Sequence, residues 1–298
     1  MPQNNQPISV GVACDNHYVM LLAALIKSIE ENIREGQKVN LYIIEDNISN
    51  RNRNKLHQSI NPAITTLFWK PIRTIIRTII ANKMKLPVDN SSYPMNIYFR
   101  FFIPFFVPDD VEKVLYLDVD MIVQKDITEL FEVDLSNHVV GAVLDPRIVT
   151  FDNSWGGVLN YKALGIPGDT KYFNTGLLLM NIPKWKELNV TEKIMQCIYD
   201  NRKFANYPDQ YALNIVLANQ WLELNSLWNH FCVFEHPSPY IIHFVQRKPI
   251  YQSYNNSLIY KEIFFSYLNK TKWKNLQPIG EMNRYIKKVK NIIDKLFK

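Results

Sequence analysis

The chain has 298 residues, a hydrophobic content of 47% and a formal net charge of +6. This apolar content is ample for a globular core, in one large α/β domain or in two smaller ones. The last fifteen residues hold six basic residues against the single acid Asp294, so they carry +5 of the net charge and the rest of the chain is nearly neutral. This distribution excludes a general nucleic-acid binder, whose basic residues would spread over a groove or a face.

The three cysteines, Cys14, Cys197 and Cys232, are far apart and form no C-x-x-C motif. Their spacing favours neither a disulfide framework nor a thiolate metal site, and it fits a reducing cytoplasm. The first residues are polar and uncharged, unlike a secretory signal, and no apolar run is long enough to span a membrane. We therefore expect a cytoplasmic protein.

A β-rich run at residues 8–14 is followed by the turn Asp15-Asn-His-Tyr18 and by a helical pattern up to Gly36. A strand, a turn and a helix in this order commonly form a nucleotide site in open α/β sheets. The turn lacks a G-x-G-x-x-G pattern, so a dinucleotide cradle is not expected. Asp15 could accept a hydrogen bond from a base on which Tyr18 stacks. The alternative is that Asp15 caps the helix and Tyr18 belongs to the core.

Two further strands, at residues 39–45 and 64–69, flank a polar helix that Ser49 caps and that runs through residue 60. The alternation predicts an α/β fold with a mostly parallel, twisted sheet and helices on both faces. Residues 72–80 fit a short helix whose arginines, Arg73 and Arg77, face solvent.

Arg100 is the one charged residue in the aromatic stretch 96–107. A guanidinium buried among rings must meet an anion, either a carboxylate of the site or a phosphate or sugar of a ligand. The alternative is an arginine that extends along the surface with its charge in water.

The apolar run 114–117 ends in Asp118-Val-Asp120. Because side chains alternate along a strand, both carboxylates point to one side while Val119 points back into the core. Two such carboxylates repel each other unless they share a proton or bind a cation, and hard oxygen ligands favour Mg²⁺ or Mn²⁺. The alternative is a turn or capping pair.

Residues 121–127 continue as an extended segment, and Thr128 opens a short helix. A further strand at 139–144 ends in Asp145, at the edge where open α/β sheets place ligands. The irregular stretch 146–171 is a plausible substrate loop or lid.

Residues 172–182 join a polar elbow to an apolar strand. In the elbow, Asn174 can bind hydroxyl groups and Gly176 permits a close approach of the backbone to a ligand. Pro183 opens a helix that is predicted to run to about Arg202.

A helix starting within residues 207–214 has Asp209 and Gln210 in its first turn, where Asp209 could also act as the helix cap. A late strand ends in His243, which is followed by Lys248-Pro. A single histidine is more often structural than a metal ligand.

Residues 250–280 show no clear pattern, but residues 284–298 form a basic amphipathic helix with one apolar stripe. Such a helix at the end of a chain either binds the anionic inner face of the cytoplasmic membrane or docks its stripe on the domain.

Taken together, these stretches resemble retaining glycosyltransferase family 8, which includes bacterial lipopolysaccharide galactosyl- and glucosyltransferases and glycogenin. The resemblance spans residues 8 to about 251, and its motifs are Val-Ala-Cys-Asp15 with Tyr18, Lys113 to Asp120, Phe173 to Asn181, Pro208-Asp-Gln210, and His243-Phe with Lys248-Pro249. It implies a GT-A domain over residues 1–251 and an extension over residues 252–298.

The resemblance also implies roles for particular residues. The metal ion, Mn²⁺ or Mg²⁺, would be held by Asp118, Asp120 and His243. The donor would be UDP-galactose or UDP-glucose, bound by Ala13, Asp15, His17, Tyr18, Arg100, Asn174, Gly176 and Lys248, with Lys248 at the diphosphate. The acceptor would be a glycan or a lipid-linked glycan, as in lipopolysaccharide or surface-glycan assembly.

For catalysis with retention we expect attack on the face that the leaving group departs from, because the neutral amide of Gln210 is a poor nucleophile. In this scheme Gln210 and Asp209 position the donor sugar and Asp145 contacts the acceptor. Two rival functions are a catalytically silent sugar-nucleotide-binding protein and a nucleotidyltransferase. The latter needs a glycine-rich basic loop after the first strand, and residues 13–18 provide none.

Two positions depart from the family pattern. His17 stands where related galactosyltransferases have an asparagine at the nucleotide. The usual glycine between His243 and Lys248-Pro is missing, and that loop is one residue shorter.

Overall fold

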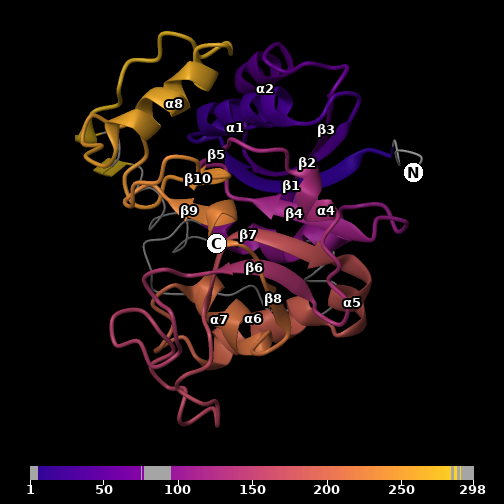
Figure 1. The fold of residues 1–298 in the computed structure, drawn as a ribbon, viewed down its shortest axis with the longest axis vertical. Helices are drawn as coiled ribbons and strands as arrows, with labels where there is room; N and C mark the ends of the chain where they lie inside the picture. The colour runs from indigo at the N-terminus through magenta and orange to yellow at the C-terminus, as the bar shows by residue number, and fades with distance from the viewer. Residues whose placement is uncertain (1–5, 75, 77–94, 283–284, 287–288, 290–298) are drawn as a thin grey trace.

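A seven-stranded sheet in the order β3-β2-β1-β4-β7-β6-β8 runs through the molecule in the computed structural model, which describes residues 6–74, 76, 95–282, 285–286 and 289 (Figure 1). Its strands are β1 (Ile8–Asp15), β2 (Val39–Asp46), β3 (Thr65–Pro71), β4 (Lys113–Leu117), β6 (Val140–Leu144), β7 (Phe173–Asn181) and β8 (Trp221–Glu223). Only β7 runs against the others. The mostly parallel sheet expected from the βαβ alternation is therefore confirmed.

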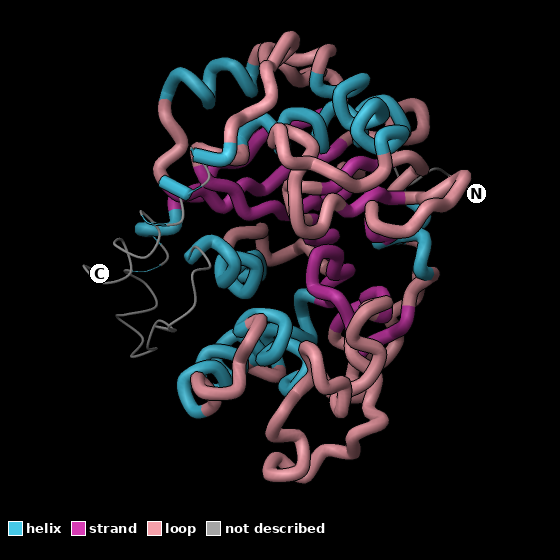
Figure 2. The backbone as a smooth tube through the Cα atoms, turned by 90° about the vertical axis from the view of Figure 1, so that its left-hand side faces the viewer, coloured by secondary structure: helices cyan, strands magenta, loops and turns pink. Residues whose placement is uncertain are grey.

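Helices cover both faces of this sheet (Figure 2). They are α1 (Val19–Asn32), α2 (Asn50–His57), α4 (Thr128–Phe131), α5 (Ile182–Glu187), α6 (Val190–Asp200), α7 (Pro208–Val216) and α8 (Leu258–Leu268), with two 3₁₀ helices, η1 (Met95–Phe105) and η2 (Ser226–Asn229). In Figure 1, α1, α2 and α8 lie on one side of the sheet and α5, α6 and α7 on the other.

The central strand β4 separates two apolar cores. Leu115 and Leu117 pack into the core under α1 and α8, whereas Val114 and Tyr116 pack into the core under η1 and α5–α7. This split follows from the alternation of side chains along a strand. Because both faces are covered, the strands are nearly continuous apolar runs.

A second sheet has three strands, β5 (Met121–Val123), β10 (Ile241–His243) and β9 (His230–Phe231). Its strand β5 follows directly after the Asp-Val-Asp motif in the chain. β10 pairs antiparallel with β5, so that His243 lies opposite Met121. The backbone N–H of Phe244 also donates to the carbonyl of Asp120 over 2.9 Å. This pairing brings the late histidine beside the motif.

The prediction of one continuous helix from Pro183 to about Arg202 is wrong, because the segment forms two helices, α5 and α6. Asn189 adopts a left-handed conformation with φ of 50°, which ends α5 and lets α6 start in a new direction. An asparagine tolerates this conformation better than most residues, so the break carries little strain.

Other differences from the predicted elements are small. The helix that Ser49 caps ends at His57, a turn earlier than expected. Residues 72–74 and 76 are helical, while Arg77 lies outside the described residues. In the stretch that had no clear pattern, α8 packs on α1 and contributes Phe264 and Leu268 to the core.

Parts of the predicted C-terminal helix lie outside the described residues. Of its apolar stripe, Tyr285, Ile286 and Val289 are described; they are helical and more than half exposed, at 55%, 59% and 55%. Within the described part of the chain, no helix is long and apolar enough to cross a membrane.

Candidate active site

A cavity of about 580 Å³ opens at the carboxyl ends of β1, β4 and β6. This is the edge at which open α/β sheets bind ligands. Of the predicted site residues, only Asp15 and His17 do not line this cavity. The residues that line it are Ala13, Tyr18, Arg100, Asp118, Asp120, Asp145, Asn174, Gly176, Asp209, Gln210, His243 and Lys248.

The structure brings Asp118, Asp120 and His243 together, with one ligand atom from each within 4.8 Å of the others. Nε2 of His243 faces Oδ1 of Asp120 at 3.5 Å. Gly176 makes room for the imidazole, because a Cβ there would lie 2.5 Å from Cε1 of His243. Two carboxylates and an imidazole suit Mn²⁺, and Mg²⁺ less well, since Mg²⁺ prefers oxygen ligands alone.

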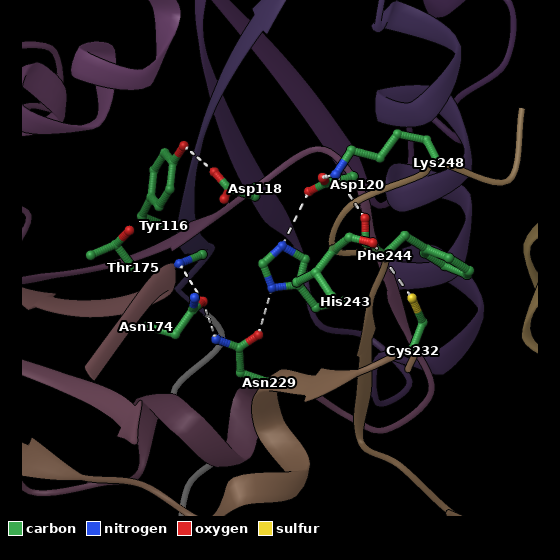
Figure 3. Close-up of polar contacts among 12 residues, drawn as sticks. Tyr116, Asp118, Asp120, Asn174, Thr175, Asn229, Cys232, His243, Phe244 and Lys248 are labelled. Atoms are coloured by element: carbon green, nitrogen blue, oxygen red, sulfur yellow. Dashed lines mark hydrogen bonds and ion pairs between the residues drawn. The ribbon is translucent and has the colours of Figure 1, made fainter. Parts of the chain in front are cut away.

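A chain of amides sets the tautomer of His243 (Figure 3). The N–H of Gly176 can only donate, and it donates to Oδ1 of Asn174 over 3.0 Å. Nδ2 of Asn229 donates to the same oxygen over 2.8 Å, which leaves Oδ1 of Asn229 to accept from Nδ1 of His243, also at 2.8 Å. The proton of a neutral His243 ring is therefore on Nδ1, and the lone pair of Nε2 points toward Asp120.

Arg100 is 5% exposed and meets carboxylates of the cavity itself. Its guanidinium lies 3.1 Å from Oδ1 of Asp118 and 3.3 Å from Oδ2 of Asp209, and it donates to the carbonyl of Thr175 over 2.6 Å. Burial alone would lower the pKa of Arg100, but the carboxylates, Asp118 first, raise it above its usual value. The cation thus holds two acidic side chains close together.

Lys248 pairs with Asp120 and also donates to the carbonyl of Phe244 over 2.7 Å. Burial alone would raise the pKa of Asp120, but the positive charge of Lys248 holds it below its usual value. Asp120 is therefore ionised at neutral pH, the state that a metal ligand needs.

Asp209 and Gln210 lie in the first turn of α7, which begins at Pro208. Burial raises the pKa of Asp209, and the Asp118 carboxylate adds to this rise against the opposing charge of Arg100.

A polar cluster links Gln210 to β7. Nε2 of Gln210 donates to Oδ2 of Asp145 over 3.1 Å, and Oε1 accepts from Nδ2 of Asn174 over 3.0 Å. Asn214, one turn further along α7, bonds both backbone groups of Phe173 and so fixes α7 against β7. Asp145 is 3% exposed, and its other oxygen accepts from backbone N–H groups of the following turn.

Where the sequence predicts the nucleotide, Tyr18 lines the cavity while Asp15 shapes the turn below it. Oδ1 of Asp15 accepts from the backbone N–H groups of His17 and Tyr18 at 2.9 and 3.0 Å. Asp15 thereby closes the turn before α1, but it does not cap the helix, because the N-cap residue of α1 is Tyr18 and no side chain caps it. Nε2 of His17 lies 2.8 Å from the hydroxyl of Tyr251, which lines the cavity in its place.

Several residues at the site were not found from the sequence. Asn229 supports His243 from η2, and a single asparagine carries no sequence signal. Arg147, Trp155, Tyr207 and Gln246 line the end of the cavity nearest Asp145. Gln246 occupies the loop that lacks the expected glycine, and its φ of 64° is one that glycine adopts most easily.

Comparison with known proteins places these features in a family. The family model described as "Glycosyl transferase family 8" matches residues 9–255. General stress protein A of Bacillus subtilis is 27% identical over 287 residues, which cover 89% of this chain and 94% of that protein. Glycosyltransferase GlyF of Streptococcus pneumoniae is 29% identical over 224 residues, covering 74% of this chain and 48% of that protein.

Among solved structures, the galactosyltransferase LgtC in complex with donor and acceptor sugar analogs superposes with a TM-score of 0.72 at 19% identity. The match covers 89% of this chain and 96% of that one. Glycosyltransferase GlyE of Streptococcus pneumoniae gives a TM-score of 0.65 at 21% identity and 96% coverage of this chain. These likenesses establish the GT-A type of fold.

Proposed function

The chain belongs to glycosyl transferase family 8, and on that premise we propose that it is a metal-dependent retaining enzyme that transfers a hexose, galactose or glucose, from a UDP-sugar to a glycan acceptor. The observation that carries the proposal is the cluster of Asp118, Asp120 and His243 on the wall of a cavity large enough for a nucleotide sugar. The two rival functions, a silent sugar-nucleotide binder and a nucleotidyltransferase, lack a comparable observation in their favour.

Asp118, Asp120 and His243 would hold the Mn²⁺ or Mg²⁺ ion, which when bound supplies positive charge at the leaving diphosphate. Lys248 sits beside Asp120, so its ammonium group adds to that charge from the protein side. Asn229 keeps the His243 proton on Nδ1, and with it the ligand lone pair on Nε2.

The donor sugar would lie between Arg100, Asn174 and the start of α7, with Asp209 and Gln210 positioning it. Gln210 is held by Asp145 and Asn174, so its amide is oriented before the substrate arrives. An amide held as a hydrogen-bonding group supports same-face attack better than nucleophilic attack by Gln210.

The nucleoside would contact Ala13 and Tyr18, with Asp15 and His17 acting from below through the turn and through Tyr251. The proposal further includes a cytoplasmic location, a transferase domain over residues 1–251 and an extension over residues 252–298. The family match, which ends at residue 255, supports that division. The acceptor would be a surface glycan such as lipopolysaccharide, free or linked to lipid.

Incubating the protein with Mn²⁺ and a panel of UDP-sugars, and following UDP release, tests the proposal. We expect release from UDP-galactose or UDP-glucose, and loss of release when the metal is chelated. Binding of UDP-sugars without release would indicate the silent binder. Formation of UDP-sugar from a sugar phosphate and UTP would indicate the nucleotidyltransferase.

A further inference from the structure

We propose that the acceptor end of the cavity is built for a sugar that carries a negative charge, with Trp155 as the platform for its ring and Arg147 as the partner of its carboxylate or phosphate. This inference rests on the proposed function, since it names the substrate class of the same site. Among the residues that the structure describes, one positive side chain at this end of the cavity has no carboxylate beside it.

Four positive side chains line the cavity, and among the described residues three of them face a carboxylate. Arg100 pairs with Asp118 and Asp209, and Lys248 pairs with Asp120. Arg247 reaches Glu281 at 3.8 Å. An unpaired cation in a partly enclosed pocket favours an anionic ligand.

Arg147 is the fourth, and in the described part of the chain its guanidinium meets no carboxylate within ion-pair distance. Its neutral partner is the side-chain amide of Gln246. In the amide orientation that satisfies both groups, the oxygen of Gln246 accepts from both terminal nitrogens of Arg147 at 2.7 Å. A neutral amide leaves the charge of the guanidinium uncompensated. A carboxylate or a phosphate could take the same two nitrogens in a bidentate pair.

Beside this cation stands an exposed aromatic platform. The indole of Trp155 is 57% exposed although it lines the cavity. Its ring centroid is 6.0 Å from that of Tyr207 and 5.9 Å from Cζ of Arg147. Leaving a large apolar ring in water costs free energy, so a fixed exposed ring beside a cavity points to a ligand that covers it.

Hydrogen bonds hold the backbone around Trp155 in place. Oδ1 of Asn153 accepts from the N–H groups of Trp155 and Gly156, and Nδ2 of Asn153 donates to the carbonyl of Arg147. Gly157 admits no side chain, because a Cβ there would lie 2.3 Å from the carbonyl oxygen of Phe151. The same asparagine therefore positions both the platform and the cation.

The position of this pair argues for the acceptor rather than the donor. Arg147 lies two residues after Asp145, the residue proposed to contact the acceptor, and donates its backbone N–H to that carboxylate, which also holds Gln210. The diphosphate already has Lys248 and the metal ligands. A sugar ring stacked on Trp155 would place its anionic group at Arg147 and one of its hydroxyls toward Gln210.

Purified full-length protein, Mn²⁺ and the active UDP-sugar would be supplied with three p-nitrophenyl β-glycosides that differ at C6: the neutral glucoside, the glucuronide and the glucoside 6-phosphate. We expect kcat/KM to be about tenfold higher for at least one charged acceptor than for the neutral one. The two charged arms distinguish a uronic acid from a sugar phosphate. No preference for either charged glycoside would overturn the proposal.

Arg147→Gln should abolish this preference. Arg147→Lys should retain part of it, because lysine keeps the positive charge but cannot form the bidentate pair. Arg202→Gln is the matched control, since Arg202 is exposed and stacks on Tyr199 outside the cavity. The preference is the ratio of kcat/KM for the charged acceptor to kcat/KM for the neutral one, so a loss of activity that affects all acceptors equally leaves it unchanged. An unchanged ratio in Arg147→Gln would overturn the proposal. A higher KM for the UDP-sugar alone would also overturn it, because it would assign Arg147 to the donor.

Trp155→Ala should lower kcat/KM about tenfold for all three glycosides, and Trp155→Phe should restore most of it. As a control, Phe105→Ala removes an aromatic ring that is 49% exposed, close to the 57% of Trp155, and that does not line the cavity. An Ala variant at position 155 with unchanged acceptor KM would contradict the platform. UDP release without any acceptor is measured first, because its absence with every donor would contradict the proposed function instead.

Discussion

Nδ1 of His243 lies 2.8 Å from the amide oxygen of Asn229, and the amide nitrogen of Asn229 is in turn committed to Asn174. The amide cannot flip without losing both hydrogen bonds, so it specifies which nitrogen of the ring carries the proton. All three side chains are buried, at 5%, 2% and 9% exposure. The proposed metal ligand His243 is therefore oriented by a residue that lies outside every motif of the family resemblance.

We expect Asn229→Ala to weaken Mn²⁺ binding by about ten- to a hundredfold, because the ring loses the partner that sets its tautomer and orientation. Titration of the protein with Mn²⁺ in the presence of UDP measures this. Asn137→Ala, at an exposed asparagine outside the cavity, serves as the control. Equal affinity in both variants would show that Asn229 has no part in metal binding.

Asp118→Ala or Asp120→Ala should lower transfer and hydrolysis by at least about a hundredfold while the protein remains folded, because a site with few protein ligands fails when one is removed. Asp109→Ala, at a fully exposed carboxylate, should behave like the wild type. Steady-state kinetics and thermal melts separate activity from folding. Activity near wild type in either variant, together with insensitivity to EDTA, would refute the metal hypothesis.

Gln210→Ala should slow transfer by about ten- to a hundredfold and leave measurable activity, since a misplaced donor reacts slowly but still reacts. Gln196→Ala, on the exposed face of α6, is the control. Mass spectrometry of the native enzyme after mixing with donor would detect a covalent sugar. An adduct on Gln210 or Asp209 would show that same-face attack is the wrong mechanism for this enzyme.

Asp209→Asn should stabilise the metal-free protein at neutral pH although it impairs activity. The folded state raises the pKa of Asp209, so the folded protein favours the protonated form, and stability is lost as pH rises from the unfolded value through the raised folded value. An amide mimics the protonated carboxyl and avoids this loss. Thermal melts with EDTA should show a higher Tm for the variant at about pH 7 and a smaller difference at about pH 4. A lower Tm at neutral pH would mean that the ion pair with Arg100 outweighs burial.

Deleting residues 284–298 decides how the basic C-terminal segment acts. Exposure of Tyr285, Ile286 and Val289 favours membrane binding over docking on the domain, with each cation near an anionic surface contributing about 1 kcal/mol at low salt. We expect the truncated protein to lose binding to phosphatidylserine vesicles and to keep its activity on soluble acceptors. A large drop in Tm with unchanged vesicle binding would favour the docked helix.

Local patterns in the sequence predicted most of the strands and helices of the fold, but not α8 or β8. The Asp-Val-Asp spacing predicted that both carboxylates point to one side. They do meet at one site, although Val119 and Asp120 lie in the turn after β4 and not in the strand. A single charge among aromatic rings predicted that Arg100 would need an anion. These predictions depend on neighbours along the chain, and strand and helix periodicity report such neighbours directly. A break such as the one at Asn189 leaves no periodic signal, so two short helices were predicted as one.

The partners of the site residues were decided by the tertiary structure alone. The pairing of β10 with β5 brings His243 to Asp120, and the position of η2 brings Asn229 to His243. The contact of Arg147 with Gln246 likewise joins two loops far apart in the sequence. Which distant segments meet depends on the packing of the whole core, a sum over many weak contacts that no local pattern records. The sequence by itself therefore determined most of the candidate site residues, and only the tertiary structure decided which of them lie together.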